Sequence, residues 1–153
     1  MKIIATIVLL GALLVPSVGQ AGVYTDDLSR CLVEASSPED KITLVRWMFS
    51  AMALHPAVQT IAPVDPAVRQ LTDKGMAELI VKLTSVTCLE QTRKAIQYEG
   101  PIALNASFNV FGQVAAQELF SNPEVARGIA GLGKFIDTEK LNKTLGIAKQ
   151  SND

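Results

Sequence analysis

The chain has 153 residues, and its 14 Lys and Arg against 15 Asp and Glu give a formal net charge of −1 at pH 7. Charges of both signs are interspersed, and this pattern excludes binding to nucleic acid or anionic membrane by bulk electrostatic attraction. The hydrophobic share of 48% excludes a chain that is disordered throughout.

The N-terminus has the layout of a secretory signal peptide. Lys2 precedes an apolar run, residues 3–15, and a turn-prone stretch with small residues ends at Ala21. The run is shorter than the roughly 20 apolar residues that span a membrane, so we expect a cleaved leader and no stable membrane insertion after cleavage. We predict a leader of residues 1–21, with cleavage after Gly19 as the alternative. The mature chain is then expected in the periplasm, or secreted.

The mature part is predicted to be one domain, residues 22–146, followed by a frayed tail at 147–153, because no linker divides it. Its two cysteines, Cys31 and Cys88, are expected to form a disulfide, as is usual for paired cysteines of an exported chain. The alternative is a reactive thiolate activated by His55.

Helix starts are marked clearly in the sequence. Residues 37–40, Ser-Pro-Glu-Asp, place a capping side chain before a proline and two acids, which suits the first turn of a helix. Similar signals occur at 65–66, at 122–124 and, more weakly, at 137–139. Helices are therefore predicted to begin at Pro38, Pro66, Pro123 and Thr138.

Apolar spacing between these signals follows the helical period, and no stretch alternates as a strand would. The predicted helices are 26–35 with Thr25 as cap, 38–54, one from Pro66, 86–99, 103–120, 123–132 and 138–145. The expected core face of the second helix is Ile42, Val45, Phe49 and Met52, widened by Leu44 and Met48, and that of the third is Val68, Leu71, Met76, Leu79, Ile80 and Leu83. The helix 103–120 is apolar on nearly all sides and should be central. The fold class is all-α, a compact orthogonal bundle of six or seven helices cross-linked by one disulfide.

Candidate residues for chemistry are few. His55 is the only histidine, which excludes any site built on a histidine pair, and we expect it to hydrogen-bond the last carbonyls of its helix. The acidic pairs at 26–27 and 39–40 belong to first helical turns, where capping explains them. We therefore predict no catalytic residue, no metal site and no cofactor: the protein is not expected to be an enzyme.

Three apolar residues are candidate partner contacts. Trp47 lies off the apolar line of its helix, so it either packs on a second neighbour or anchors a partner. Leu132 lies in a glycine-spaced stretch, 128–134, and Phe135 follows it directly. The stretch matches no phosphate-binding pattern and is predicted to form a flexible helix end and turn.

Two stretches, SRCLVEASSPEDKITLVRWMFSAMALHPAV and YEGPIALNASFNVFGQVAAQELFSNPEVA, resemble a group of small exported proteins of Gram-negative bacteria that are largely uncharacterised. The resemblance rests on Cys31, Arg46-Trp47, His55-Pro56, Cys88, Glu99-Gly100-Pro101 and Gly112-Gln113-Val114. It implies a periplasmic location and a helical fold, and it assigns no site residue.

The sequence as a whole favours a non-enzymatic, periplasmic protein-binding module, such as an inhibitor or immunity protein that covers a partner. The alternative is a carrier that holds a small apolar ligand or lipid between its helices, because Met48, Met52 and Met76 suit an adaptable pocket.

Overall fold

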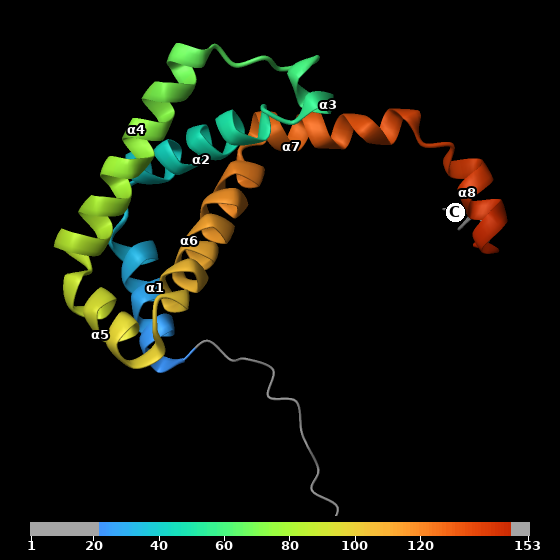
Figure 1. Ribbon diagram of the computed structural model, residues 1–153. Coiled ribbons are helices and arrows are strands. Elements are labelled where there is room, and N and C mark those ends of the chain that lie inside the picture. Colours follow the sequence, from blue (N-terminus) through green and yellow to red (C-terminus); the bar gives the residue numbers. More distant parts are fainter. Residues whose placement is uncertain (1–21, 148–153) are drawn as a thin grey trace, which may run out of the picture.

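The computed structural model describes residues 22–147 and contains eight α-helices (Figure 1). They are α1 Val23–Ala35, α2 Pro38–Met52, α3 Pro56–Gln59, α4 Pro66–Lys82, α5 Leu89–Glu99, α6 Ile102–Ser121, α7 Pro123–Ala130 and α8 Thr138–Leu145. A π-helical segment, η1 Leu83–Thr87, joins α4 to α5, and a 3-10 helix, η2 Gly131–Phe135, follows α7. No strand occurs between residues 22 and 147, which confirms the predicted all-α fold. The predicted leader and residues 148–153 of the predicted tail lie outside the described residues.

The four helix starts predicted from the sequence are confirmed, each with a side-chain cap. Ser37 and Asp40 form a reciprocal capping box at the start of α2, with distances of 3.1 and 3.0 Å. The side chains of Asp65, Asn122 and Asp137 accept backbone N–H groups at the starts of α4, α7 and α8. Gly146 ends α8 with a φ of 66°, a left-handed conformation that glycine adopts without strain.

The start of α1 differs from the prediction. The helix begins at Val23, two residues before the expected cap Thr25, and a side chain from another helix supplies the cap. Glu99, the last residue of α5, accepts the N–H groups of Tyr24 and Thr25, both at 2.9 Å. The Thr25 hydroxyl donates to the same carboxylate at 2.5 Å. Sequence patterns report only local caps, so this contact across the fold left no signal.

The core lies where α1, α5 and α6 meet and extends between α2 and α4. Phe111, in the middle of α6, is fully buried, and its ring meets Phe108 edge-on with 6.3 Å between centroids. Around them lie Leu28, Leu32, Leu44, Met76, Leu79, Leu83, Cys88 and three alanines. No helix of the described part is long and apolar enough to cross a membrane.

The predicted disulfide is confirmed. Cys31 of α1 is bonded to Cys88, the residue between η1 and α5, and their Cα atoms lie 6.0 Å apart. The bond fixes α1 against the point where α4 gives way to α5. A disulfide of this kind is typical of an oxidising compartment, and it excludes both sulfurs as nucleophiles.

Helix α6 is central only as far as Ala115. Its buried residues end there, and none of residues 116–147 is buried. Beyond Ser121, α7, η2 and α8 extend from the bundle as an arm (Figure 1). Among the bundle helices, α7 packs to any extent only on α6. The prediction of a wholly central helix 103–120 was therefore wrong for residues 116–120, because an apolar circumference does not tell a buried surface from an uncovered one.

Candidate functional site

The main concave feature is an apolar groove between α4 and α6, with α2 as its floor. It consists of two adjoining hollows of about 480 and 900 Å³ that share Met48 and Ala116. We call this feature the α4–α6 groove. Both volumes lie in the range of sites that bind ligands or the anchors of a partner.

The walls of the groove follow from helical spacing. On α4 the lining residues recur every fourth position, so they form one straight stripe; they are Val68, Thr72, Met76 and Ile80. The α6 wall runs from Leu104 to Leu119, a length of about 22 Å at the rise of an α-helix. The groove therefore follows nearly the whole of α6.

The floor corrects the predicted core face of α2. Of the residues expected in the core, Leu44 is buried and Val45 and Met48 pack partly buried against the core, but Ile42, Phe49 and Met52 are about half exposed. Phe49 and Met52 line the groove instead, and Val45 contributes to both. Helix α2 is apolar on two faces, of which one packs on the core and the other is left uncovered, and periodicity alone does not show which is which.

The same correction applies to α4. Met76, Leu79 and Leu83 are buried as expected, but Val68 and Leu71 are exposed at 49% and 69%. The N-terminal half of α4 therefore extends past the core and serves as a wall of the groove.

Three polar contacts hold the floor and walls in place. Lys82 of α4 pairs with Asp40 of α2 at 2.8 Å, and Lys41 of α2 pairs with Glu118 of α6 at 2.5 Å. Arg69 of α4 donates to the carbonyl oxygen of Ser50 at 2.5 Å. The groove is thus preformed, and a ligand would not have to order these helices on binding.

The charge on Asp40 is favoured by its surroundings. Burial raises the pKa of this carboxyl, but hydrogen bonds from Lys82 and from the Ser37 backbone outweigh that effect, so the pKa lies below its usual value. Asp40 consequently stays ionised at neutral pH and keeps its contact with Lys82.

One polar group of the floor has no hydrogen-bond partner. Ser50 lines the groove and is only 2% exposed, and its hydroxyl makes no hydrogen bond within the described residues. A buried polar group without a partner is unfavourable.

The three predicted partner contacts lie in different places. Trp47 is half-buried, packs on the core and lines the larger hollow of the groove. Leu132 and Phe135 lie in η2 on the arm, where they are 65% and 87% exposed. The helix predicted over 123–132 is confirmed to Ala130 as α7, but the turn predicted after it is helical too, since α7 continues directly into η2. The role of these residues in binding stays a prediction.

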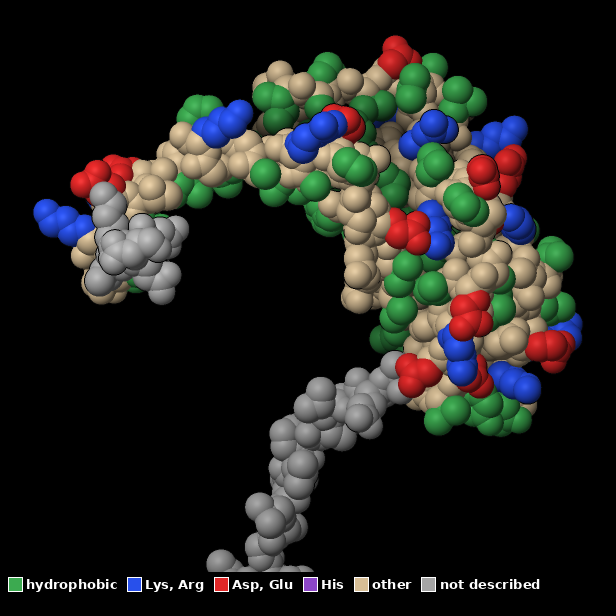
Figure 2. Space-filling view, turned by 180° about the vertical axis from the view of Figure 1, so that it is seen from behind, with side chains coloured by type: hydrophobic (Ala, Val, Ile, Leu, Met, Phe, Trp, Pro, Cys, Tyr) green, Lys and Arg blue, Asp and Glu red, His purple; other side chains and the backbone are tan. Residues whose placement is uncertain are grey.

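Hydrophobic side chains are exposed along much of the arm (Figure 2). In α7 and η2, Val125, Ile129 and Leu132 follow one another at intervals of four and three residues, so they share one face of the helix. Ile136 follows directly after η2. Phe135 lies beside this face. We call these five residues the arm stripe.

His55 does not take its predicted role. Helix α2 ends at Met52, before His55, and His55 instead caps the short helix α3, where its Nδ1 accepts the N–H of Ala57 at 3.2 Å. The following Pro56 holds His55 in an extended conformation, with ψ of 130°, and turns the imidazole toward the next helix. The role of His55 is therefore structural, as expected, but at the opposite kind of helix end.

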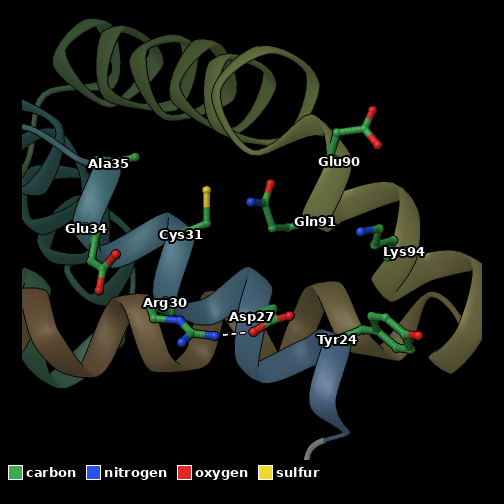
Figure 3. A pocket seen from close by; sticks show the side chains of 9 residues that line it. All are labelled: Tyr24, Asp27, Arg30, Cys31, Glu34, Ala35, Glu90, Gln91 and Lys94. Atoms are coloured by element: carbon green, nitrogen blue, oxygen red, sulfur yellow. Dashed lines mark hydrogen bonds and ion pairs between the residues drawn. The ribbon is translucent and has the colours of Figure 1, made fainter.

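A second, polar hollow of about 510 Å³ lies between α1 and α5 beside the disulfide (Figure 3). Asp27, Arg30, Glu90 and Lys94 line it, and Arg30 is paired with Asp27. Its one sulfur, that of Cys31, is engaged in the disulfide. Within residues 22–147, no group of three or more His, Cys, Asp or Glu side chains is placed to hold a metal ion.

Sequence reasoning missed the residues that form the groove walls. The sequence analysis placed Val68 and Leu119 in the core and did not single out Thr72, because a single sequence does not show that α4 and α6 lie apart. The available signal was that α2 and α6 carry more apolar residues than one core contact uses.

Comparisons with known proteins found no match: no protein-family model, no curated protein and no solved structure matches the chain.

Proposed function

We propose that the protein is a non-enzymatic binding protein of the periplasm, and that its α4–α6 groove takes an apolar helix of a protein partner. The observation that carries the proposal is the preformed, uncovered groove, about 22 Å long, on a bundle that is otherwise well packed. Exposed apolar surfaces of this extent are characteristic of interaction sites. Amphipathic helices bind in such grooves through side chains at three- and four-residue spacing.

Two features of the lining support a peptide partner. Met48, Met52 and Met76 provide flexible, polarisable contacts that adapt to an irregular helix face. Arg46 and Thr72 place polar groups in the lining of one hollow, where a partner's polar side chain or backbone would find a hydrogen bond.

A carrier of a small apolar ligand is the second candidate. The observation in its favour is the hollow of about 900 Å³ around Trp47, Met48 and Met76, which is large enough for an acyl chain. Native mass spectrometry of protein purified from its own periplasm distinguishes the two: a retained mass of lipid size supports the carrier, and a bare chain contradicts it.

Site-specific crosslinking tests the proposal directly. Phe49, half exposed on the groove floor, is replaced by the photoreactive analogue p-benzoylphenylalanine in the exported full chain, and cells are irradiated. We expect a discrete adduct with a polypeptide. Tyr98, 60% exposed on α5 and outside the groove, is the matched control position and should give no such adduct. Equal labelling at both positions, or none at position 49, would contradict the proposal.

A further inference from the structure

The arm has an apolar stripe and no surface of its own bundle to cover it. Ile129, Leu132 and Phe135 are 55%, 65% and 87% exposed. Helices of eight residues are only marginally stable in water by themselves and depend on packing of an apolar face. The arm is therefore incomplete as it stands and needs a partner surface.

The groove and the arm match in chemistry and in length. The groove is lined mainly by apolar side chains and measures about 22 Å along α6. Helices α7 and η2 together span residues 123–135, and their combined length is also about 22 Å at the rises of α- and 3-10 helices. The arm stripe thus provides an apolar helix of the size that the groove accommodates.

The arm does not fold back into the groove of its own chain. A single residue, Asn122, separates α6 from α7, whereas antiparallel helix pairs need connections of about two to five residues. The Asn122 side chain accepts the N–H of Glu124 at 2.9 Å, and Pro123 occupies the first helical position. A reversal of the chain here would break that cap and the conformation that Pro123 favours.

We propose that the arm stripe of one copy occupies the α4–α6 groove of a second copy, and that the two chains exchange arms in a symmetric dimer. This rests on the proposed function of the groove as a site for an apolar helix and names the occupant. In such a dimer each arm meets the other copy's groove, so the contact closes with two-fold symmetry and leaves no unmatched surface.

The area involved is sufficient for a stable dimer. Each large apolar side chain of the arm stripe buries roughly 100 Å². The five side chains therefore contribute roughly 500 Å² per arm, and the groove contributes somewhat less. Counted over both arms, the exchange buries roughly 1,700 Å², which is within the range for stable interfaces.

The test uses the mature full chain and three single variants at exposed positions. Leu132→Asp introduces a charge on the arm stripe, Phe49→Asp introduces one on the groove floor, and Val86→Asp is the control, since Val86 is 73% exposed in η1 and lines no part of the groove. Light scattering after size exclusion, over a dilution series, gives the mass. Wild type and the Val86 variant should be dimers, and the other two should be monomers at the same concentration.

Mixing the two monomeric variants then tests whether arm and groove are each other's partners. The mixture contains one intact arm and one intact groove on different chains, so we expect a heterodimer, weaker than the wild-type dimer but absent from either variant alone. A monomeric wild type, a mixture that stays monomeric, or equal dissociation of the Val86 variant would overturn the inference.

The crosslinking experiment separates this inference from the proposed function. An adduct at position 49 with twice the mass of the chain supports arm exchange. An adduct with a different polypeptide, together with a monomeric wild type, refutes arm exchange and leaves the groove's role as a helix-binding site intact. No adduct and a monomeric wild type refute both.

Discussion

Removing the disulfide should cost a large share of the stability of this fold. Cys31 and Cys88 are 57 residues apart in the sequence, and for a closed loop of that length the chain-entropy relation gives about 4 kcal/mol. The net stability of a domain is typically about 5–15 kcal/mol. At roughly 3–5 °C per kcal/mol for a domain of this size, the midpoint of thermal unfolding should fall by about 12–20 °C.

Two routes to the same state make the measurement specific. Thermal unfolding is followed by circular dichroism for wild type with and without reductant, and for the double variant Cys31→Ala, Cys88→Ala. We use alanine because Cys88 is fully buried and a serine hydroxyl would lack a partner there. Reduced wild type and the double variant should unfold at similar temperatures, and reductant should have no effect on the variant.

The reasoning is refuted if reductant shifts the wild-type midpoint by less than about 3 °C while mass spectrometry confirms that the bond is open. That result would mean that residual contacts between the segments of α1, α5 and α6 already restrict the unfolded chain, or that the loop entropy is compensated elsewhere. Free thiols in natively folded, exported protein would contradict the pairing itself.

Three further predictions concern single residues. A Cβ at Gly22 would clash with a carboxylate oxygen of Glu99. Gly22→Ala should therefore displace the cap of α1 and lower the melting temperature by about 5 °C. Gly128→Ala is the control and should not lower the melting temperature, because no described atom lies within 4 Å of the added carbon. The hydrogen bond from the Thr25 hydroxyl, with backbone N–H groups, lowers the pKa of Glu99 below its ordinary 4.5 despite burial. The stabilisation that the ionised Glu99 contributes is therefore present at neutral pH and is lost as pH falls through the folded-state pKa. Glu99→Gln should make the melting temperature depend less on pH below 4.5, and an unchanged dependence would argue against the cap. Thr92 is buried, and its hydroxyl has no hydrogen-bond partner among the described residues. Thr92→Val should raise the free energy of unfolding by about 1 kcal/mol in denaturant unfolding. A loss of stability would show that the hydroxyl is hydrogen-bonded.

Local signals in the sequence predicted the helix starts well. Ser37, Asp65, Asn122 and Asp137 each cap the helix that follows, because a capping side chain interacts with backbone groups two or three residues away and tertiary context has little influence on it. The disulfide was predictable for another reason, since the chain contains only two cysteines.

Contacts between distant segments were not predictable in the same way. The cap that Glu99 provides for α1 joins residues 74 and 75 positions apart. The divergence of α4 and α6, which opens the groove, likewise depends on how α2 packs between them. A single sequence shows neither that Glu99 lies next to the start of α1 nor that α4 and α6 lie apart.

The error on α2 is informative about function. The sequence analysis took its Ile42, Val45, Phe49 and Met52 face for the core because a continuous apolar stripe usually packs inside a domain. The structure buries only Leu44 at the margin of that stripe and leaves Ile42, Phe49 and Met52 half exposed, and α6 from Ala116 onward and the arm are uncovered in the same way. Single exposed apolar residues need no explanation, but three uncovered apolar surfaces on neighbouring helices do. We propose a common cause, that the fold of one chain is not the whole packing unit: a partner helix in the groove covers Phe49 and Met52 of α2 and the end of α6, and the arm is covered where it enters the groove of a second copy.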